Sequence, residues 1–200
     1  MPDIKHFDPD AALDRVVNLF WQRGADNAAI AEVVSVTGLS RSSLYATFGG
    51  KDQLYAAALH RYLERHSRPL FAALAADRRG LPAITDFFHR LVQARCTGEH
   101  ARWGCLISNA HTSAHTSAGR DLPEVRQALE AHHRDLRAAM RSALEAGSVR
   151  DGLDLEAAAK MLTLLAYGVN LRSRAGADPQ ELLAGVEAAL SPLEPPMKEN

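Results

Sequence analysis

Apolar residues recur with the period of an α-helix along most of this chain, and glycine and proline separate the periodic stretches. In the first stretch, Leu13, Val16 and Phe20 fall on one face of a helix that Asp8 can cap. No segment shows the sustained alternation of apolar and polar residues that marks a β-strand. The sequence therefore predicts an all-α fold.

Caps and helix-breaking residues place the individual helices. Asp8, Ser40 and Asp154 are typical N-caps, whereas Gly24 and the Gly49-Gly50 pair end helices. The expected helices cover residues 9–23, 28–35, 41–47, 51–68, 69–76, 82–95, 103–111, 122–146, 155–173 and 178–190.

The composition excludes several classes of protein. Of the 200 residues, 46% are hydrophobic and 24% are charged, which is ordinary for a globular protein and not for a disordered one. No apolar stretch is long enough to span a membrane, and the acidic N-terminus is not a signal peptide. Two cysteines do not make a disulfide framework. We therefore expect a cytoplasmic protein that has no membrane partner.

Two short expected helices flank Gly38, which suits a tight turn because glycine adopts a left-handed backbone at low cost. Val34 before the turn and Leu44 after it can pack the two helices together. Short helices joined in this way predict a helix-turn-helix. The second helix begins with the hydroxyls and the guanidinium of residues 40–43, which can reach base edges and phosphates in a major groove.

Residues 38–54, GLSRSSLYATFGGKDQL, and residues 19–24, LFWQRG, resemble the signature of the TetR/AcrR family of bacterial transcriptional regulators. The resemblance covers about residues 8–66. It implies a three-helix DNA-binding domain over residues 1–66 and a helical effector-binding and dimerisation domain over residues 67–200. By the resemblance, the residues that contact DNA are Ser40, Arg41, Ser42, Ser43, Tyr45, Thr47 and Lys51.

The sequence departs from the family's usual pattern in charge and in one cap. Residues 1–66 contain seven basic and eight acidic residues and no basic N-terminal arm. We therefore expect weak non-specific DNA binding with a shallow salt dependence, because few phosphates would be neutralised. Ala28 and Ala29 precede the second helix, so we expect its cap to come from Asp26 or Asn27, or to be absent.

The last two expected helices are apolar on more than one face, so each needs a second partner. A larger core within one chain would supply it. The resemblance implies instead a two-fold homodimer built on a four-helix bundle. We expect the dimer interface to include Leu162, Leu165, Ala166, Val169, Leu182, Leu183, Val186 and Leu190.

The middle helices should enclose a cavity for a small-molecule effector if the resemblance holds. Each residue of the candidate set can equally belong to the core. The set comprises Phe87, Phe88, Trp103, Cys105, Asn109, His132, Met140, Met161 and Tyr167.

Cysteine and histidine raise two further questions. Cys105 begins an expected helix, where the helix dipole favours a thiolate, and some regulators of the family sense oxidants or electrophiles through cysteine. The alternative is a buried small hydrophobic residue. His111 and His115 have a spacing that can hold a metal, but a loop or helix end rich in Ser and Thr explains them better. We therefore expect neither a metal nor a cofactor.

Taken together, these patterns predict a ligand-responsive transcriptional regulator. We expect a repressor that a small hydrophobic or reactive effector releases from a palindromic operator in double-stranded DNA. The alternatives are a helical protein-interaction module that has lost DNA binding, and a thiol-based enzyme. The enzyme is disfavoured because the sequence has no nucleophile elbow, phosphate loop, metalloprotease helix or Cys-x-x-Cys motif.

Overall fold

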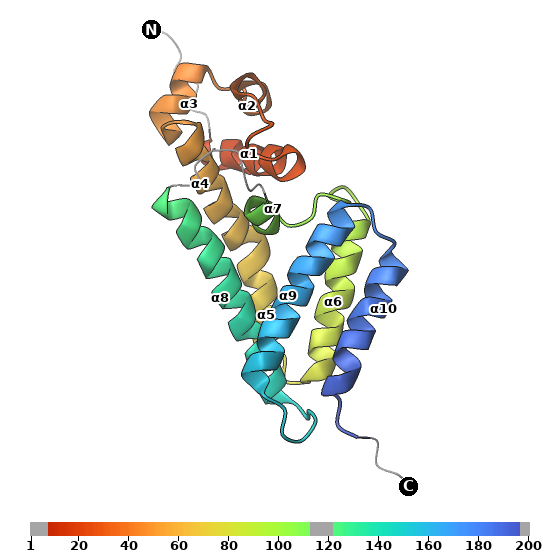
Figure 1. Ribbon diagram of the computed structural model, residues 1–200. Helices are drawn as coiled ribbons and strands as arrows, with labels where there is room; N and C mark the ends of the chain where they lie inside the picture. Colours follow the sequence, from red (N-terminus) through yellow and green to blue (C-terminus); the bar gives the residue numbers. More distant parts are fainter. Residues whose placement is uncertain (1–7, 113–121, 197–200) are drawn as a thin grey trace.

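The computed structural model describes residues 8–112 and 122–196, and these residues form helices and short connections (Figure 1). No strand occurs in the part of the chain that it describes. The expected all-α fold is therefore confirmed.

Four helices form the N-terminal domain: α1 (Pro9–Arg23), α2 (Ile30–Thr37), α3 (Arg41–Phe48) and α4 (Lys51–Tyr62). Gly38 ends α2 with φ at +72°, the left-handed conformation that the sequence predicts, and its N–H bonds to the carbonyl of Val34. The helix-turn-helix therefore forms as expected. In Figure 1 its second helix, α3, lies at the end of the molecule that is farthest from the C-terminal bundle.

The chain stays helical beyond α4, because a π-helical turn (Leu63–Ser67) links it directly to α5 (Arg68–Ala76). Pro69 lies in the first turn of α5, directly after the π-helical turn, where the fixed φ of proline suits the start of a helix. The resulting rod runs from the helix-turn-helix into the C-terminal half of the molecule (Figure 1). The boundary expected between the two domains, after residue 66, falls inside the π-helical turn.

The C-terminal half comprises α6 (Leu81–Cys96), α7 (Leu106–Thr112), α8 (Pro123–Ala146), α9 (Leu155–Arg174) and α10 (Pro179–Leu190), followed by a short 3₁₀ turn (Ser191–Leu193). Helix α8 packs on both α5 and α9, and α10 packs mainly on α6. The boundaries of these five helices agree with the sequence prediction to within about three residues, whereas the expected helix over residues 51–68 is divided into α4 and the π-helical turn.

The buried apolar side chains form two clusters, and the division between them does not follow the order of the sequence. The first cluster contains the core of α1–α4, and it also takes in Leu106 and Ile107 of α7 and Val125 and Ala128 of α8. The second fills the space between α5, α6, α8, α9 and α10. Helix α7 therefore belongs by packing to the DNA-binding half of the molecule.

Helix α2 begins without a side-chain cap from Asp26 or Asn27, which is one of the alternatives that the sequence left open. Its N-cap is Ala29, which follows Asp26 and Asn27 and has no side chain that can cap. Glu32 instead accepts a hydrogen bond from the N–H of Ala29 at 2.9 Å and pairs with Arg23 of α1. Asn27 donates to the carbonyl of Arg23, at the end of α1. A carboxylate in the first turn thus satisfies the exposed N–H in place of the usual cap.

Candidate DNA-binding surface and effector site

The N-terminus of α3 is ordered by its own serine residues. Ser40 is the N-cap and accepts a hydrogen bond from the N–H of Ser43 at 3.1 Å. Its hydroxyl lies 2.9 Å from the hydroxyls of both Ser42 and Ser43. Leu44 is buried and fixes the opposite side of the helix to the core. The helix can therefore present its first turn to a ligand without reordering.

Arg41 and Tyr45 lie one turn apart on the outer side of α3. Nη2 of Arg41 donates to the Tyr45 hydroxyl at 3.3 Å, and its guanidinium carbon lies 5.4 Å from the centre of the Tyr45 ring. Both side chains are exposed. The tyrosine therefore restrains a guanidinium that otherwise projects into solvent, which lowers the entropy lost when that group binds.

The structure places all seven expected DNA contacts on α3 or directly beside it. Five of them are exposed, namely Ser40, Arg41, Ser42, Tyr45 and Thr47, and Ser43 and Lys51 are partly exposed. Gly49 and Gly50 bring the chain around so that Lys51 begins α4 next to the end of α3.

The ion pairs explain how a domain with excess acid can still present basic groups. Arg61 pairs with Asp10 at 2.7 Å and with Asp14 at 2.8 Å, and Arg65 reaches Asp14 at 3.7 Å. These pairs join α1 to the rod of α4. Arg41 and Lys51 take part in none of the ion pairs found in the described residues. The local charge on the α3 side is thus more positive than the domain total suggests.

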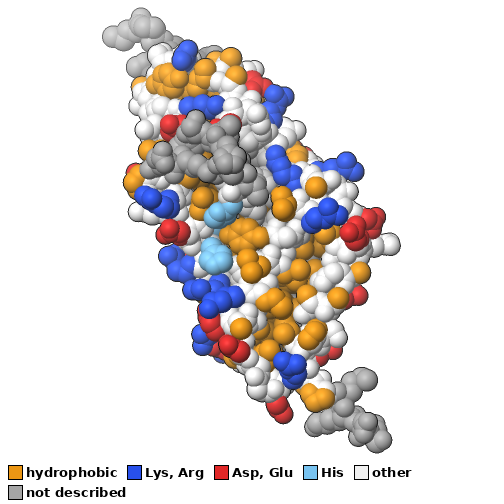
Figure 2. All heavy atoms as spheres, in the orientation of Figure 1, with side chains coloured by type: hydrophobic (Ala, Val, Ile, Leu, Met, Phe, Trp, Pro, Cys, Tyr) orange, Lys and Arg blue, Asp and Glu red, His pale blue; other side chains and the backbone are white. Residues whose placement is uncertain are grey.

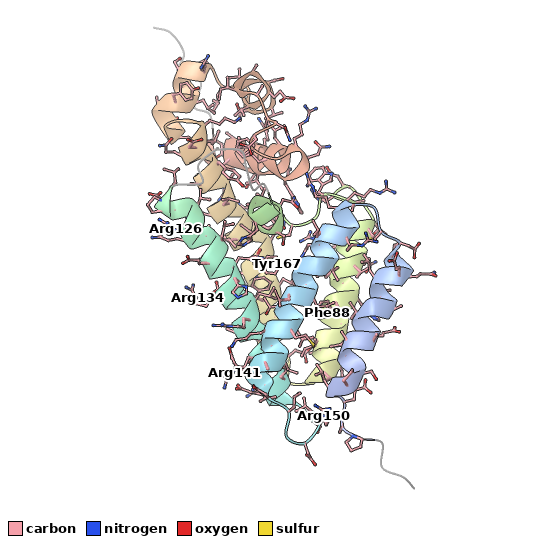
Figure 3. The ribbon with its side chains drawn as sticks, in the orientation of Figure 1. Phe88, Arg126, Arg134, Arg141, Arg150 and Tyr167 are labelled. Atoms are coloured by element: carbon pink, nitrogen blue, oxygen red, sulfur yellow. The ribbon has the colours of Figure 1, made fainter. Side chains whose placement is uncertain are left out.

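In the interior, Cys105 borders a small cavity that is also lined by His132, Arg95, His66, Phe71 and Phe87. The space in it is about 20 Å³, which is room for about one water molecule. Sγ of Cys105 lies 3.8 Å from Nε2 of His132, and Nδ1 of that ring lies 3.1 Å from the Tyr167 hydroxyl. Tyr167 projects from α9 toward α8 (Figure 3).

The surroundings of Cys105 favour its thiolate. Burial by itself would raise the pKa of the thiol, but the hydrogen bond to His132 and the charges of His132 and Arg95 outweigh burial and lower that pKa to about 6. Cys96 shows the opposite behaviour, because partial burial and the charge of Asp178 raise the pKa of its thiol. The more deeply buried cysteine is thus the more acidic one.

The other expected effector residues do not share one cavity. Phe88 and Met140 are fully buried core residues, and Trp103 and Asn109 lie between the two halves of the molecule. Met161 is 38% exposed on the surface of α9. A larger hollow of about 620 Å³ lies at the start of α6, and it contains none of the expected residues.

A cluster that the sequence analysis missed joins the DNA-binding domain to the segment before α7. The indole N–H of Trp21 donates to the carbonyl of Gly104 at 2.8 Å. Nη1 of Arg174 on α9 donates to the carbonyls of Trp21, at 3.3 Å, and Trp103, at 2.7 Å. The Gly104 carbonyl belongs to the residue directly before Cys105. No sequence pattern links these positions, because Trp21 is 83 residues away from Gly104 and 153 residues away from Arg174.

Aromatic rings reinforce this junction around Trp21. His100 stacks on the indole with ring centres 4.8 Å apart, and Tyr62 and Trp103 pack edge-on at 4.9 and 5.5 Å. The guanidinium of Arg95 lies 5.3 Å from the Trp21 ring and donates to the Tyr62 hydroxyl at 3.2 Å. Arg95 therefore touches both the Trp21 cluster and the cavity of Cys105.

Most of the residues expected at a dimer interface are packed inside the single chain. Six of the eight residues expected at a dimer interface are buried inside the single chain, so its own core covers them, and Leu165 and Leu183 are partly exposed. The large apolar side chains that α9 exposes are Met161, Leu164 (66% exposed) and Leu171 (50% exposed). Figure 2 shows hydrophobic side chains gathered on the face of the C-terminal bundle. We call Met161, Leu164 and Leu171 the α9 apolar surface.

Only one member of the histidine pair, His111, lies within the described residues. His115 lies outside the described residues, and the His111 ring packs against Tyr167 with centres 5.5 Å apart. Among residues 8–112 and 122–196, no three His, Cys, Asp or Glu side chains come together as metal ligands do. None of the described helices has the length and apolar character that crossing a membrane needs.

Comparison with known proteins gives the family. Residues 12–58 match the model of bacterial regulatory proteins of the tetR family, and residues 80–189 match the tetracyclin repressor-like C-terminal domain. The transcriptional repressor ComR of Escherichia coli (strain K12) is 30% identical over 94% of this chain and 90% of its own length. The uncharacterized regulator YezE of Bacillus subtilis (strain 168) is 28% identical over 95% of this chain and 98% of its own.

Solved structures agree with these matches. A cysteine mutant of the TetR family transcriptional regulator CifR, in complex with 26-base-pair operator DNA, has a TM-score of 0.78 and 30% identity. The match covers 94% of this chain and 98% of CifR. The reduced form of E. coli NemR has a TM-score of 0.72 at 21% identity, covering 90% and 96% of the two chains, which supports the fold. The chain belongs to the TetR family of DNA-binding transcriptional regulators.

Proposed function

We propose that this protein is a cytoplasmic repressor, not an enzyme, and that it binds a palindromic operator as a homodimer with α3 in the major groove. The observation that carries the proposal is the outer side of α3, where Arg41 and the serine hydroxyls project from a helix that Leu44 anchors to the core. The names of ComR, a repressor, and of the CifR complex with operator DNA support it.

The chemistry of each group suggests its role in DNA binding. The guanidinium of Arg41 suits a guanine edge, since it can donate two parallel bonds to O6 and N7. The hydroxyls of Ser42 and Tyr45 suit phosphate oxygens. Lys51 adds an ammonium to the N–H groups at the start of α4, a favourable place for a phosphate. Arg41 would then specify sequence, and the other groups would position the helix.

The α9 apolar surface, together with α10, is our proposed dimer interface. An exposed apolar face of this kind is unusual on a monomer and is typical of an interface. A two-fold axis through it would present two α3 helices to successive major grooves, roughly 34–36 Å apart. The palindromic operator follows from that symmetry.

We propose further that the effector is a small reactive molecule that modifies Cys105. The cavity at Cys105 holds about 20 Å³, whereas pockets for drug-sized ligands are roughly 300–1,000 Å³. A covalent bond to an acidic thiol does not depend on burying a large ligand. Any added group must displace neighbours, because interiors are close-packed.

The route from Cys105 to the DNA-binding domain is short. Helix α7 shares the apolar cluster of α1–α4, and the carbonyl next to Cys105 accepts the hydrogen bond of Trp21. An adduct that shifts the start of α7 would therefore move α1 as well. Modification changes operator affinity only if the adduct stabilises the DNA-binding arrangement and the released arrangement of the protein to different extents.

A genomic-fragment binding selection at moderate salt, read by sequencing, tests DNA binding. We expect enrichment of a palindrome, and loss of that enrichment for Arg41→Ala and Lys51→Ala. Arg150→Ala serves as the control, because Arg150 is an exposed arginine at the opposite end of the molecule (Figure 3). Enrichment of no sequence by the reduced protein would contradict the repressor and support an interaction module.

A further inference from the structure

The Cys105 thiol is held by several polar groups from different helices. His132 of α8 contacts it through Nε2 at 3.8 Å, and the Tyr62 hydroxyl of α4 is also hydrogen-bonded to it. The N–H of Ser108 donates to it from α7. Nδ1 of His132 in turn lies 3.1 Å from the hydroxyl of Tyr167 on α9. This arrangement goes beyond a cysteine that only fills space.

We propose that His132 is the general base that takes the proton of Cys105, that Tyr167 positions the imidazole, and that the resulting thiolate adds to compact α,β-unsaturated aldehydes. This inference rests on the proposed function only in treating Cys105 as the effector site. The chemistry itself requires no DNA and is tested without it.

The hydrogen bonds fix the role of each imidazole nitrogen. For Nε2 to accept the thiol proton, the neutral ring must carry its hydrogen on Nδ1. That N–H can then donate to the oxygen of Tyr167. Burial raises the pKa of the Tyr167 phenol, so it stays neutral and does not compete as an acid. Tyr167 thus stabilises the tautomer that leaves Nε2 available.

The charged and titratable groups around the thiol come from every element packed on it. Arg95 of α6 supplies a positive charge, and Tyr62 has a pKa that burial, followed by the charge of Cys105, holds above its usual value. His66 of the π-helical turn lines the same cavity, and burial, then Arg95, lowers its pKa. Among the histidines that line the cavity, His132 is the one whose ring nitrogen contacts the thiol, at 3.8 Å.

The addition is balanced without an oxidant or reductant. His132 removes the proton from Sγ, and the thiolate electron pair forms an S–C bond to the β-carbon of the aldehyde. The C=C π pair moves toward the carbonyl and gives an enolate. The imidazolium returns the proton, which ends on the α-carbon, and the product is a thioether that keeps its aldehyde. The cavity of about 20 Å³ favours the smallest members of this class.

The test measures alkylation of purified full-length protein by acrolein, followed by intact mass and peptide mapping, between about pH 5 and pH 9. A Cys96→Ser background leaves one thiol. We expect modification of Cys105 with a rate midpoint at about pH 6. His132→Gln should lower the rate at pH 7 at least tenfold and move the midpoint toward the ordinary thiol value of about 8.5.

Matched variants separate a chemical role from a structural one. Tyr167→Phe keeps the ring, removes the hydroxyl and should slow the reaction several-fold with a raised midpoint. His133→Gln changes the neighbouring histidine of α8 and should leave rate and midpoint unchanged. N-phenylmaleimide, with rates normalised to free cysteine, should react relatively more slowly than acrolein. If His132→Gln lowers thermal stability, His132→Asn supplies the same comparison.

An unchanged midpoint in His132→Gln, or acrolein that spares Cys105 in the unaltered protein, would overturn the proposal. Operator affinity of the adduct is measured separately by fluorescence anisotropy. An adduct that forms with the expected pH dependence but leaves operator affinity unchanged would contradict the proposed effector role and leave the assignment of His132 intact.

Discussion

Single side chains carry the contact that we expect with DNA, and Arg41 and Tyr45 show how they depend on one another. The tyrosine hydroxyl accepts from the guanidinium, and the ring packs beside it. The sequence predicted both residues as DNA contacts from the resemblance of residues 38–54. It could not predict their pairing, because side-chain conformation on an exposed helix depends on local geometry that the sequence pattern does not specify.

A double-mutant cycle measures this dependence. We expect Arg41→Ala to weaken operator binding by ~1–3 kcal/mol and to relax specificity at one base pair. Tyr45→Phe should cost about 1 kcal/mol, since it removes one hydrogen-bond acceptor. The double variant should lose less than the sum, because the hydroxyl acts partly through the guanidinium. Fluorescence anisotropy with the selected operator gives all three values, and strict additivity would show that the pair does not cooperate.

At the scale of helices and their connections, the sequence predicted where each helix lies but not how the ends meet. Gly80 and Gly147 come from the loops before α6 and after α8, and a Cβ on Gly80 would lie 2.5 Å from Cα of Gly147. The two glycines are far apart in sequence, so no local pattern reveals the contact. The same holds for Trp21 and Gly104, and this is why the junction between the domains was missed.

Gly80→Ala should destabilise the protein more than Gly98→Ala. Both glycines have positive φ, at +75° and +77°, so a side chain strains the backbone at either position, and Gly80, with ψ at −130°, lies outside the left-handed helical region. A methyl group at Gly98 meets nothing within 4 Å, whereas one at Gly80 meets the backbone of Gly147. Urea denaturation of the two variants measures the difference in their unfolding free energies. Equal losses of unfolding free energy would mean that the loops separate easily.

Trp21→Phe removes the hydrogen bond to the Gly104 carbonyl and keeps an aromatic ring in the cluster. Operator affinity of the reduced protein should change little, since α3 is untouched. The loss of affinity after alkylation of Cys105 should shrink, because α1 is no longer tied to the residue before the adduct. Anisotropy before and after acrolein treatment measures both. If acrolein still abolishes operator binding in this variant, the coupling between Cys105 and the DNA-binding domain does not pass through the Trp21 hydrogen bond.

For the molecule as a whole, the all-α fold and the family followed from periodicity and one motif of 17 residues. The residues of the dimer surface and of the effector site are harder to predict, and both stay predictions. Residues that are apolar on several faces of a helix can be buried by their own chain or by a partner, and sequence alone does not distinguish the two. Leu162, Ala166 and Val169 are buried within the protomer, and Leu164 and Leu171 are the exposed leucines of α9.

Leu164→Asp should therefore weaken the homodimer, with Leu171→Asp acting in the same direction. A carboxylate at the centre of an apolar interface loses its hydration without gaining a partner, which costs several kcal/mol. Sedimentation velocity should show monomers at concentrations where the unaltered protein is dimeric. Val36→Asp, at an exposed apolar residue of α2, serves as the control and should remain dimeric. Dimers that persist in both α9 variants would exclude this surface.

The residues of the first apolar cluster determine which segments of such a regulator can be exchanged between proteins. Leu106, Ile107, Val125 and Ala128 lie beyond residue 66 in sequence, yet they complete the core around α1–α4. A hybrid regulator that joins a foreign DNA-binding domain at residue 66 would inherit a core built for other side chains. The transferable module is thus discontinuous, and recombination at the apparent boundary is penalised unless α7 and the start of α8 travel with the helix-turn-helix.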